Sequence, residues 1–324
     1  MAFTKQEVEY FPFGASPIEN GMWSNLNLNQ DELYENVIQP VLFCITDFTI
    51  PAADTGFHTH FKWMLEKNVD NEDVLVFIRA KRTGGSGTVV FKAHLDATDD
   101  DASSIASGVG TAYQDIILTV TPTTSTTSRE MYLEIKTSDT GTAAHVDSIA
   151  VYTVPGSPSV GTLTSSFVGM PSAGFPTDGP INTERMSRLR NGPIHVTHDR
   201  PSCVYSFLDD FANPRNFKTN STSFVSTLNA RIPFPDKVRR DYLLYMYLNS
   251  NSGSGSPSAR IILDGKQIGS DVSGAGWKTF YLNEITNDIK KFHHGYLDVH
   301  LKDASGSYYT SVTSLQIIRN PVAP

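Results

Sequence analysis

The sequence carries little positive charge and contains no long uninterrupted apolar run. Its 324 residues include 26 Lys and Arg against 34 Asp and Glu, which gives a formal net charge of -8. Nucleic-acid binding relies on a cationic surface, so we expect no nucleic-acid partner. No stretch approaches the roughly eighteen apolar residues of a membrane-spanning helix, and residues 1–7 lack the basic and apolar regions of a secretory signal. We therefore expect no membrane insertion and synthesis without an export signal.

Cysteine is also scarce, since only Cys44 and Cys203 are present, one in each half of the chain. Each begins a strand-like apolar run, a position that suits a small buried hydrophobic residue. The two could pair only if the halves packed together with suitable geometry, which the sequence does not determine. We expect two free thiols.

Motifs that carry catalysis are missing as well. The sequence has no nucleophile elbow, no phosphate-cradling loop and no zinc-spaced Cys/His cluster. The glycine-rich residues 84–87 stand between two expected strands, which indicates a turn and no phosphate site. Glycoside hydrolysis needs two carboxylates that flank the substrate, whereas Glu134 and Asp298 are single outward acids on expected strands. We expect no enzymatic activity and no cofactor.

The sequence does contain enough apolar residues for folded domains, with 39% hydrophobic and 10% aromatic residues. The length suits two domains of ordinary size. Proline, glycine and serine become frequent after residue 154, and proline and glycine both disfavour sheet. The predicted organisation is an N-terminal arm (1–40), a first domain (41–154), a linker (155–199) and a second domain (200–324).

The two halves repeat one another in four matched blocks. The blocks pair residues 73–78 with 242–248, 113–118 with 277–282, 132–136 with 296–300, and 146–152 with 312–318. The first pair is typical of a buried strand that runs into a glycine-rich turn and a second strand ending in Leu-Asp. The third pair alternates inward aliphatic with outward charged residues, as a half-solvated antiparallel strand does. Similarity over so long an offset indicates a duplicated domain.

Many short strands, polar turns and little helical periodicity predict an all-β fold of two tandem antiparallel β-sandwich (jelly-roll) domains. Each half ends with a Tyr-Leu-acid-aliphatic strand and a glycine loop, followed by a hydrophobic strand with Val and Ser near its start. This ending resembles the last hairpin of carbohydrate-binding-module or galactose-binding-like jelly rolls. Tandem sandwiches preceded by a short polar arm also resemble virion proteins of tailed bacteriophages.

The resemblance implies a non-enzymatic structural or adhesion protein of a phage particle, as a tail, fibre or capsid decoration component. Its location would be the virion, and its partners other virion proteins or copies of itself in a homo-oligomer, together with host-surface glycan. The alternative is a soluble protein built from glycan-binding modules.

Four aromatic residues are candidates for stacking on a sugar ring. Tyr113 and Trp277 occupy equivalent positions at the head of the second matched block, where period two places them opposite the inward residues. Tyr308 and Tyr309 stand in a polar loop of the second half. For both pairs the alternative is that the rings cover the edge of their own core.

Two groups of residues are candidates for metal ligands. His58 and His60 would share one face of a strand, as in cupin-type jelly rolls, but no acid follows at the cupin spacing, and a solvated strand face is the alternative. Asp96, Asp99 and Asp101 offer hard oxygens to Ca²⁺ but lack EF-hand spacing, which favours a solvated acidic turn.

Overall fold

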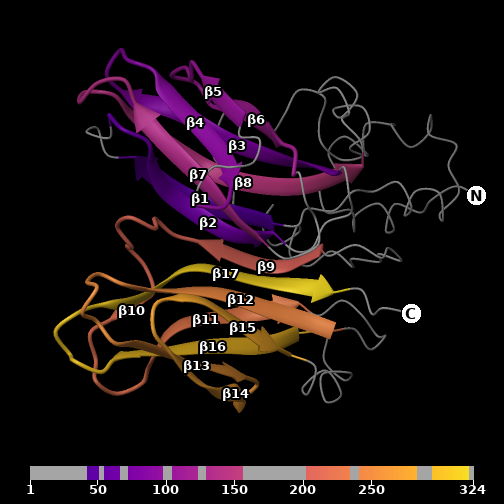
Figure 1. The fold of residues 1–324 in the computed structure, drawn as a ribbon, viewed down its shortest axis with the longest axis vertical. Helices are drawn as coiled ribbons and strands as arrows, with labels where there is room; N and C mark the ends of the chain where they lie inside the picture. Colours follow the sequence, from indigo (N-terminus) through magenta and orange to yellow (C-terminus); the bar gives the residue numbers. More distant parts are fainter. Residues whose placement is uncertain are drawn as a thin grey trace, which may run out of the picture.

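The computed structural model describes residues 42–50, 55–65, 72–97, 104–122, 129–155, 202–233, 241–282 and 294–320. These residues form strands and turns, and none of their segments is a helix that could cross a membrane. The predicted arm and most of the predicted linker lie outside the described residues, so their boundaries stay predictions. Two β-sandwiches are stacked one above the other (Figure 1).

The first sandwich consists of two four-stranded antiparallel sheets. Its strands are β1 (Leu42–Ile50), β2 (His58–Leu65), β3 (Glu72–Gly84), β4 (Val89–Leu95), β5 (Ser104–Ser107), β6 (Gln114–Val120), β7 (Arg129–Thr137) and β8 (Ala143–Pro155). One sheet has the order β1-β8-β3-β6 and the other β2-β7-β4-β5. Fully buried side chains between the sheets include Phe61, Trp63 and Phe91. Burial of each stabilises the fold by about 1.5–3 kcal/mol.

The second sandwich repeats this arrangement. Its strands are β9 (Ser202–Leu208), β10 (Lys218–Thr219), β11 (Val225–Pro233), β12 (Asp241–Ser250), β13 (Pro257–Leu263), β14 (Lys266–Ser273), β15 (Gly276–Tyr281), β16 (His294–Asp303) and β17 (Thr310–Asn320). In one sheet β9 and the short β10 both pair with β17, which is followed by β12 and β15. The other sheet has the order β11-β16-β13-β14.

The two strand orders coincide position by position, so the prediction of two tandem antiparallel β-sandwiches is confirmed. The repeat extends to the backbone after β4 and β13, where Asp96 and Asp264 both adopt positive φ angles of 56° and 49°. Each donates its amide N–H over 2.9 Å, Asp96 to the carbonyl of Glu130 and Asp264 to that of Tyr296. Aspartate tolerates this left-handed conformation better than most residues, which explains the Leu-Asp ending in both halves.

Candidate functional site

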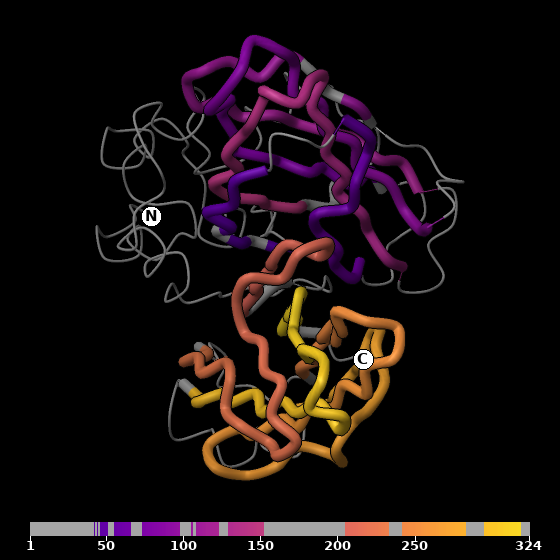
Figure 2. Tube along the Cα trace, turned by 90° about the vertical axis from the view of Figure 1, so that its left-hand side faces the viewer, coloured from indigo at the N-terminus to yellow at the C-terminus, as the bar shows by residue number. Residues whose placement is uncertain are grey.

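Strand β9 joins the two sandwiches. It pairs with β17 in the second sandwich and also lies along the open edge of the first, next to β1 (Figures 1 and 2). Successive side chains of a strand point to opposite sides. Leu208 is 2% exposed and belongs to the first core, whereas Phe207 packs against the second core and Phe217. The amide N–H of Leu208 lies 3.2 Å from Sγ of Cys44, which is buried.

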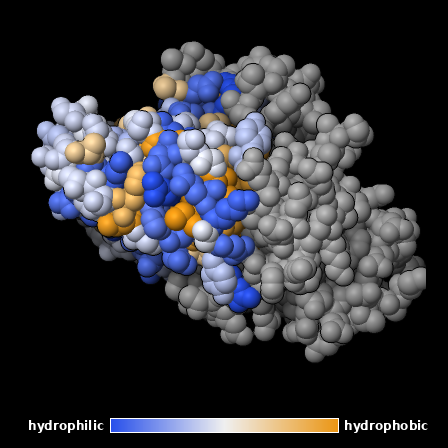
Figure 3. Space-filling model, turned by 90° about the horizontal axis from the view of Figure 1, so that it is seen from below, coloured by the Kyte–Doolittle hydropathy of each residue, from blue (hydrophilic) through white to orange (hydrophobic). Residues whose placement is uncertain are grey.

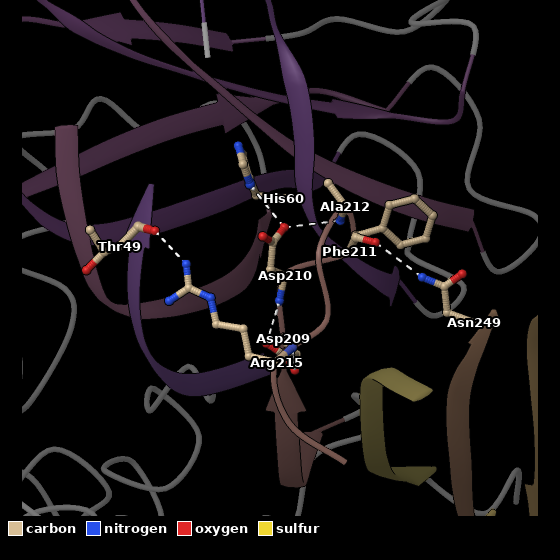
Figure 4. Close-up of polar contacts among 8 residues, drawn as sticks. All are labelled: Thr49, His60, Asp209, Asp210, Phe211, Ala212, Arg215 and Asn249. Atoms are coloured by element: carbon tan, nitrogen blue, oxygen red, sulfur yellow. Dashed lines mark hydrogen bonds and ion pairs between the residues drawn. The ribbon is translucent and has the colours of Figure 1, made fainter. Parts of the chain in front are cut away.

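A buried histidine–aspartate pair follows directly after β9. Nδ1 of His60 lies 3.1 Å from Oδ1 of Asp210, and both side chains are 2% exposed. The same carboxylate oxygen accepts the amide N–H of Ala212 (Figure 4). The amide of Phe211 donates to the carbonyl of His60 over 2.8 Å. His60 therefore bonds across the joint through both its ring and its backbone carbonyl.

The burial of His60 corrects the expectation of a solvated face shared by His58 and His60. The register of β2 against β7 shifts between Thr59 and Phe61, so strict alternation is broken at His60. His58 is exposed while His60 points into the joint. The described residues contain no group of three or more His, Cys, Asp or Glu side chains placed to hold a metal ion.

Calcium at the acidic turn stays a hypothesis, because Asp99 and Asp101 lie outside the described residues. Asp96 is described, and its Oδ2 accepts two hydrogen bonds from the guanidinium of Arg129, at 3.0 and 2.8 Å. The side chain of Cys203 is also outside the described part, so the expectation of a free thiol there stays a prediction.

Arg215 adds a second contact between the sandwiches. One of its guanidinium nitrogens donates to the carbonyl of Thr49 over 3.0 Å, and its Cζ lies 4.8 Å from the ring centre of Phe48 (Figure 4). At β2, the side-chain amide nitrogen of Gln316 donates to the carbonyl of Met64, and its oxygen accepts the backbone N–H of Met64. These bonds tie β1 and β2 to the second sandwich.

Aromatic rings surround Lys62 beside these contacts. Its Nζ lies 4.0 Å from the ring centre of Phe211, 4.6 Å from that of Tyr132 and 5.2 Å from that of Tyr247. Cation–π attraction of this kind stabilises a partly buried ammonium group. Burial lowers the pKa of Lys62, and the nearby carboxylate of Glu130 partly opposes this effect.

Trp277, one of the predicted stacking residues, belongs to this joint. Its ring meets Tyr247 edge-on with 5.2 Å between centroids, and it packs with Met64 on the small cluster that contains Leu243 and Tyr245. The indole ring is half buried, and much of its surface is occupied by the two sandwiches. Its role in stacking on sugar stays a prediction.

Tyr113, which the sequence match pairs with Trp277, lies in a separate place, and the strand registers make Asp115 the position equivalent to Trp277. Its ring is half buried, with Nζ of Lys81 4.4 Å and Cζ of Arg79 5.1 Å from its centre, and His145 contacts it edge-on. Burial raises the pKa of Tyr113, the charge of Asp147 adds to this rise, and Arg79 opposes it. Cationic side chains therefore already accompany this ring.

Tyr308 and Tyr309 lie in the loop between β16 and β17, apart from the other two. Tyr309 is 44% exposed, its amide donates to Oδ1 of Asn251 over 2.7 Å, and Nζ of Lys218 lies 5.5 Å from its ring centre. Tyr308 is half buried. The four predicted aromatic residues thus contact different neighbours and do not form one surface.

The sequence reasoning missed a further aromatic surface. It lies on the side of the sheet β11-β16-β13-β14 that points away from the core, which we name the outer face. Along β16 the residues Leu297, Val299 and Leu301 are fully buried, so Tyr296 and every second residue after it point outward. Tyr296 is 58% exposed. Viewed from below, the described surface of this sandwich is largely hydrophilic, with hydrophobic residues between (Figure 3).

Hydrogen-bonding side chains accompany Tyr296 on the outer face. Nε2 of His300 lies 2.7 Å from Oδ2 of Asp298, and the hydroxyl of Ser226 donates to the other oxygen of that carboxylate over 2.5 Å. Arg231 of β11 stands directly opposite Tyr296 in the register and is exposed. The alternation of β16 was visible in the sequence and would have placed Tyr296 on the outward side.

A charge pair and a second ring lie farther along the outer face. Arg260 donates to both oxygens of Asp271 at 2.8 and 2.9 Å, and the amide of Gln267 also donates to this carboxylate. The hydrogen bonds from Arg260 lower the pKa of Asp271. The ring of Phe224 lies under Cζ of Arg260 and Nζ of Lys302, 4.3 and 4.5 Å from its centre.

The sequence match pairs Tyr296 with Tyr132, but the strand registers shift this match by two residues. Leu95 faces Met131 and Leu263 faces Leu297, so Tyr132 takes the place of Asp298. Tyr132 is 6% exposed, stacks on His94 with 5.0 Å between ring centroids, and donates a hydrogen bond to the carboxylate of Glu130. Burial and this hydrogen bond raise its pKa. Tyr132 therefore serves the joint, whereas Tyr296 faces outward.

Comparison with known proteins gave structural matches of low similarity. No protein-family model and no curated protein matches the chain. A tandem CBM22 domain of Xyn10C from Paenibacillus barcinonensis matches with 11% identity and a TM-score of 0.22, covering 87% of this chain and 98% of its own. The insecticidal delta-endotoxin Cry8Ea1 of Bacillus thuringiensis matches with 9% identity and a TM-score of 0.24, covering 87% and 60%.

A putative secreted protein of Parabacteroides distasonis matches with 9% identity and a TM-score of 0.21, covering 85% of this chain and 86% of its own. Similarity this low carries no argument about function. The β-sandwich architecture rests on the strand pairing described above.

Proposed function

We propose that the protein is a non-enzymatic glycan-binding protein and that the outer face of its second sandwich is the binding surface. The observation that carries the proposal is the outward ring of Tyr296, 58% exposed on a strand whose neighbouring outward side chains form hydrogen bonds. An exposed aromatic ring offers an apolar plane on which the C–H face of a sugar can stack.

The polar side chains beside the ring suit hydroxyl groups of a glycan. Asp298 and His300 hold each other in one orientation, and Gln267 and Asp271 are likewise bonded to a neighbour. Side chains that are fixed before binding lose less conformational entropy when a ligand arrives. The aromatic residues of the joint are less suitable, because Trp277 and its neighbours already pack between the sandwiches.

A glycan array followed by titration calorimetry with Tyr296→Ala tests the proposal. Loss of the stacking plane is expected to weaken binding by about tenfold, which corresponds to roughly 1–2 kcal/mol. Tyr281→Ala is the matched control, since Tyr281 is 67% exposed but lies on β15 of the other sheet. Unchanged affinity of Tyr296→Ala, or no retained glycan on the array, would contradict the proposal.

A second candidate function, a structural component of a tailed-phage virion, is supported by the joint. The buried pair of His60 and Asp210, together with Leu208 in the first core, favours one rigid unit suited to bearing load. In this role the partners would be other virion proteins or copies of the chain. Imaging of particles labelled at the C-terminus tests it, and a chain that is never found in particles would exclude it.

A further inference from the structure

We propose that the glycan recognised by the outer face is acidic and that Arg231 binds its carboxylate groups. This inference rests on the proposed function and names the ligand class. It is carried by the pairing of Arg231 with Tyr296 across β11 and β16, which places an exposed guanidinium beside the exposed ring. Directly opposed residues of antiparallel strands have Cβ atoms about 5 Å apart.

The charges of the outer face favour an anionic ligand. Its outward cations are Arg231, Arg260 and Lys302, and its outward carboxylates are Asp271 and Asp298. Each carboxylate is already occupied, Asp271 by Arg260 and Asp298 by His300 and Ser226. Among the described residues no ion pair engages Arg231 or Lys302. The positive charge of Arg231 is therefore left for a ligand, whereas Lys302 lies over the ring of Phe224 and its charge also acts on Asp271.

One more carboxylate, that of Asp264, lies near Tyr296 in the turn after β13. Its Oδ1 accepts the backbone N–H of Tyr296 over 2.8 Å, which holds the start of this strand in place. This carboxylate is thus bonded to the backbone of β16, whereas Arg231 is on the opposite neighbouring strand β11. The guanidinium remains the cationic group directly across from the ring.

The geometry matches a sugar with a carboxylate substituent. A sugar ring stacked on Tyr296 presents its substituents at the level of the neighbouring side chain, where a guanidinium can donate two parallel N–H groups to a carboxylate. Lys302 follows Tyr296 by six residues on the same strand, which is about 20 Å at the rise of an antiparallel strand. An extended acidic polysaccharide along β16 meets a cation at both ends of this path.

The net negative charge of the whole chain opposes the binding of an acidic glycan. With a formal net charge of -8, the protein as a whole repels a polyanion, so binding depends on a local cationic surface. The attraction is between exposed charges and is screened by salt, with a Debye length of about 8 Å at physiological ionic strength. Affinity for an acidic glycan is therefore expected to fall as salt is added.

The test uses polygalacturonate, alginate and hyaluronan, each beside its carboxyl-reduced counterpart, in titrations of the full chain. We expect wild-type protein to bind at least one acidic polymer more tightly than its reduced form. Arg231→Gln is expected to weaken binding of that polymer roughly tenfold to a hundredfold, as for loss of a charged hydrogen bond, and to leave binding of the reduced form unchanged. Arg231→Lys keeps the charge without the planar guanidinium group. Its affinity for the acidic polymer should lie between those of the wild type and Arg231→Gln.

Lys266→Gln is the matched control, because Lys266 is an exposed cation at the start of the edge strand β14. Equal binding of acidic and reduced polymers, abolished by Tyr296→Ala, would overturn the acidic ligand while leaving the glycan-binding function intact. Unchanged affinity of Arg231→Gln for the acidic polymer would also overturn it. Binding to none of the polymers or glycans would refute both proposals together.

Discussion

The position of Leu208 on β9 leads to a sharp prediction about stability. This side chain belongs to the second half of the chain and yet is buried in the core of the first sandwich, where it is 2% exposed. Leu→Ala substitutions at buried sites cost about 2–5 kcal/mol, the sum of lost apolar transfer and the cavity left behind. We expect Leu208→Ala to destabilise the first sandwich by about 3 kcal/mol.

Phe207→Ala provides the matched perturbation, because Phe207 is the adjacent residue and packs on the second core. Hydrogen exchange followed by mass spectrometry distinguishes the two variants, since amides of β1 and β2 report on the first sandwich and those of β11 and β16 on the second. A loss of about 3 kcal/mol accelerates exchange through unfolding by roughly a hundredfold.

Leu208→Ala should therefore raise exchange most in β1 and β2, and Phe207→Ala most in β11 and β16. Unchanged protection of β1 and β2 in Leu208→Ala would refute the idea that β9 completes the first core. Equal acceleration everywhere in both variants would show instead that the two sandwiches unfold as a single unit.

Three further predictions concern other parts of the molecule. Asp210→Asn leaves His60 without its charged partner at a buried site and should lower the free energy of unfolding by about 3 kcal/mol in a urea titration. Gly85→Ala should lower the free energy of unfolding by about 1 kcal/mol or more, because Gly85 has φ of +64° and a Cβ there would lie 2.6 Å from the nearest atom. Gly253→Ala is the control and should be nearly neutral, because a Cβ there would meet nothing within 4 Å. The raised pKa of Tyr132 keeps this phenol protonated where the unfolded chain ionises, so stability should fall as pH rises above about 10, and Tyr132→Phe should reduce that fall in alkaline denaturation curves.

The architecture could be predicted because the information that specifies it is local and occurs twice. Each matched block falls on a strand, for example residues 73–78 on β3 and 242–248 on β12, and the two strands take the same place in their sheets. Alternation along β7 and β16 also gave the inward residues correctly. Local patterns of this kind record which side of a strand is buried.

The joint could not be predicted, because alternation does not say what covers each side of a strand. Phe207 and Leu208 are both apolar neighbours on β9, and only the folded chain shows that they enter different cores. The same limit applies to Tyr132 and Tyr296, which both point outward by alternation although only Tyr296 is exposed. One register shift in β2 was enough to turn His60 from the expected solvated face into the interface.

The sharing of β9 also has a consequence for the order of events during synthesis. Strands β1 to β8 leave the ribosome first, but Leu208 follows Pro155 by about 50 residues. At roughly 5–20 residues per second, the nascent first sandwich therefore waits about 3–10 s for the residue that closes its edge. During this interval Cys44 and the flanks of β1 and β2 are unprotected, which makes this edge the point at which a chaperone or a neighbouring nascent chain would first make contact.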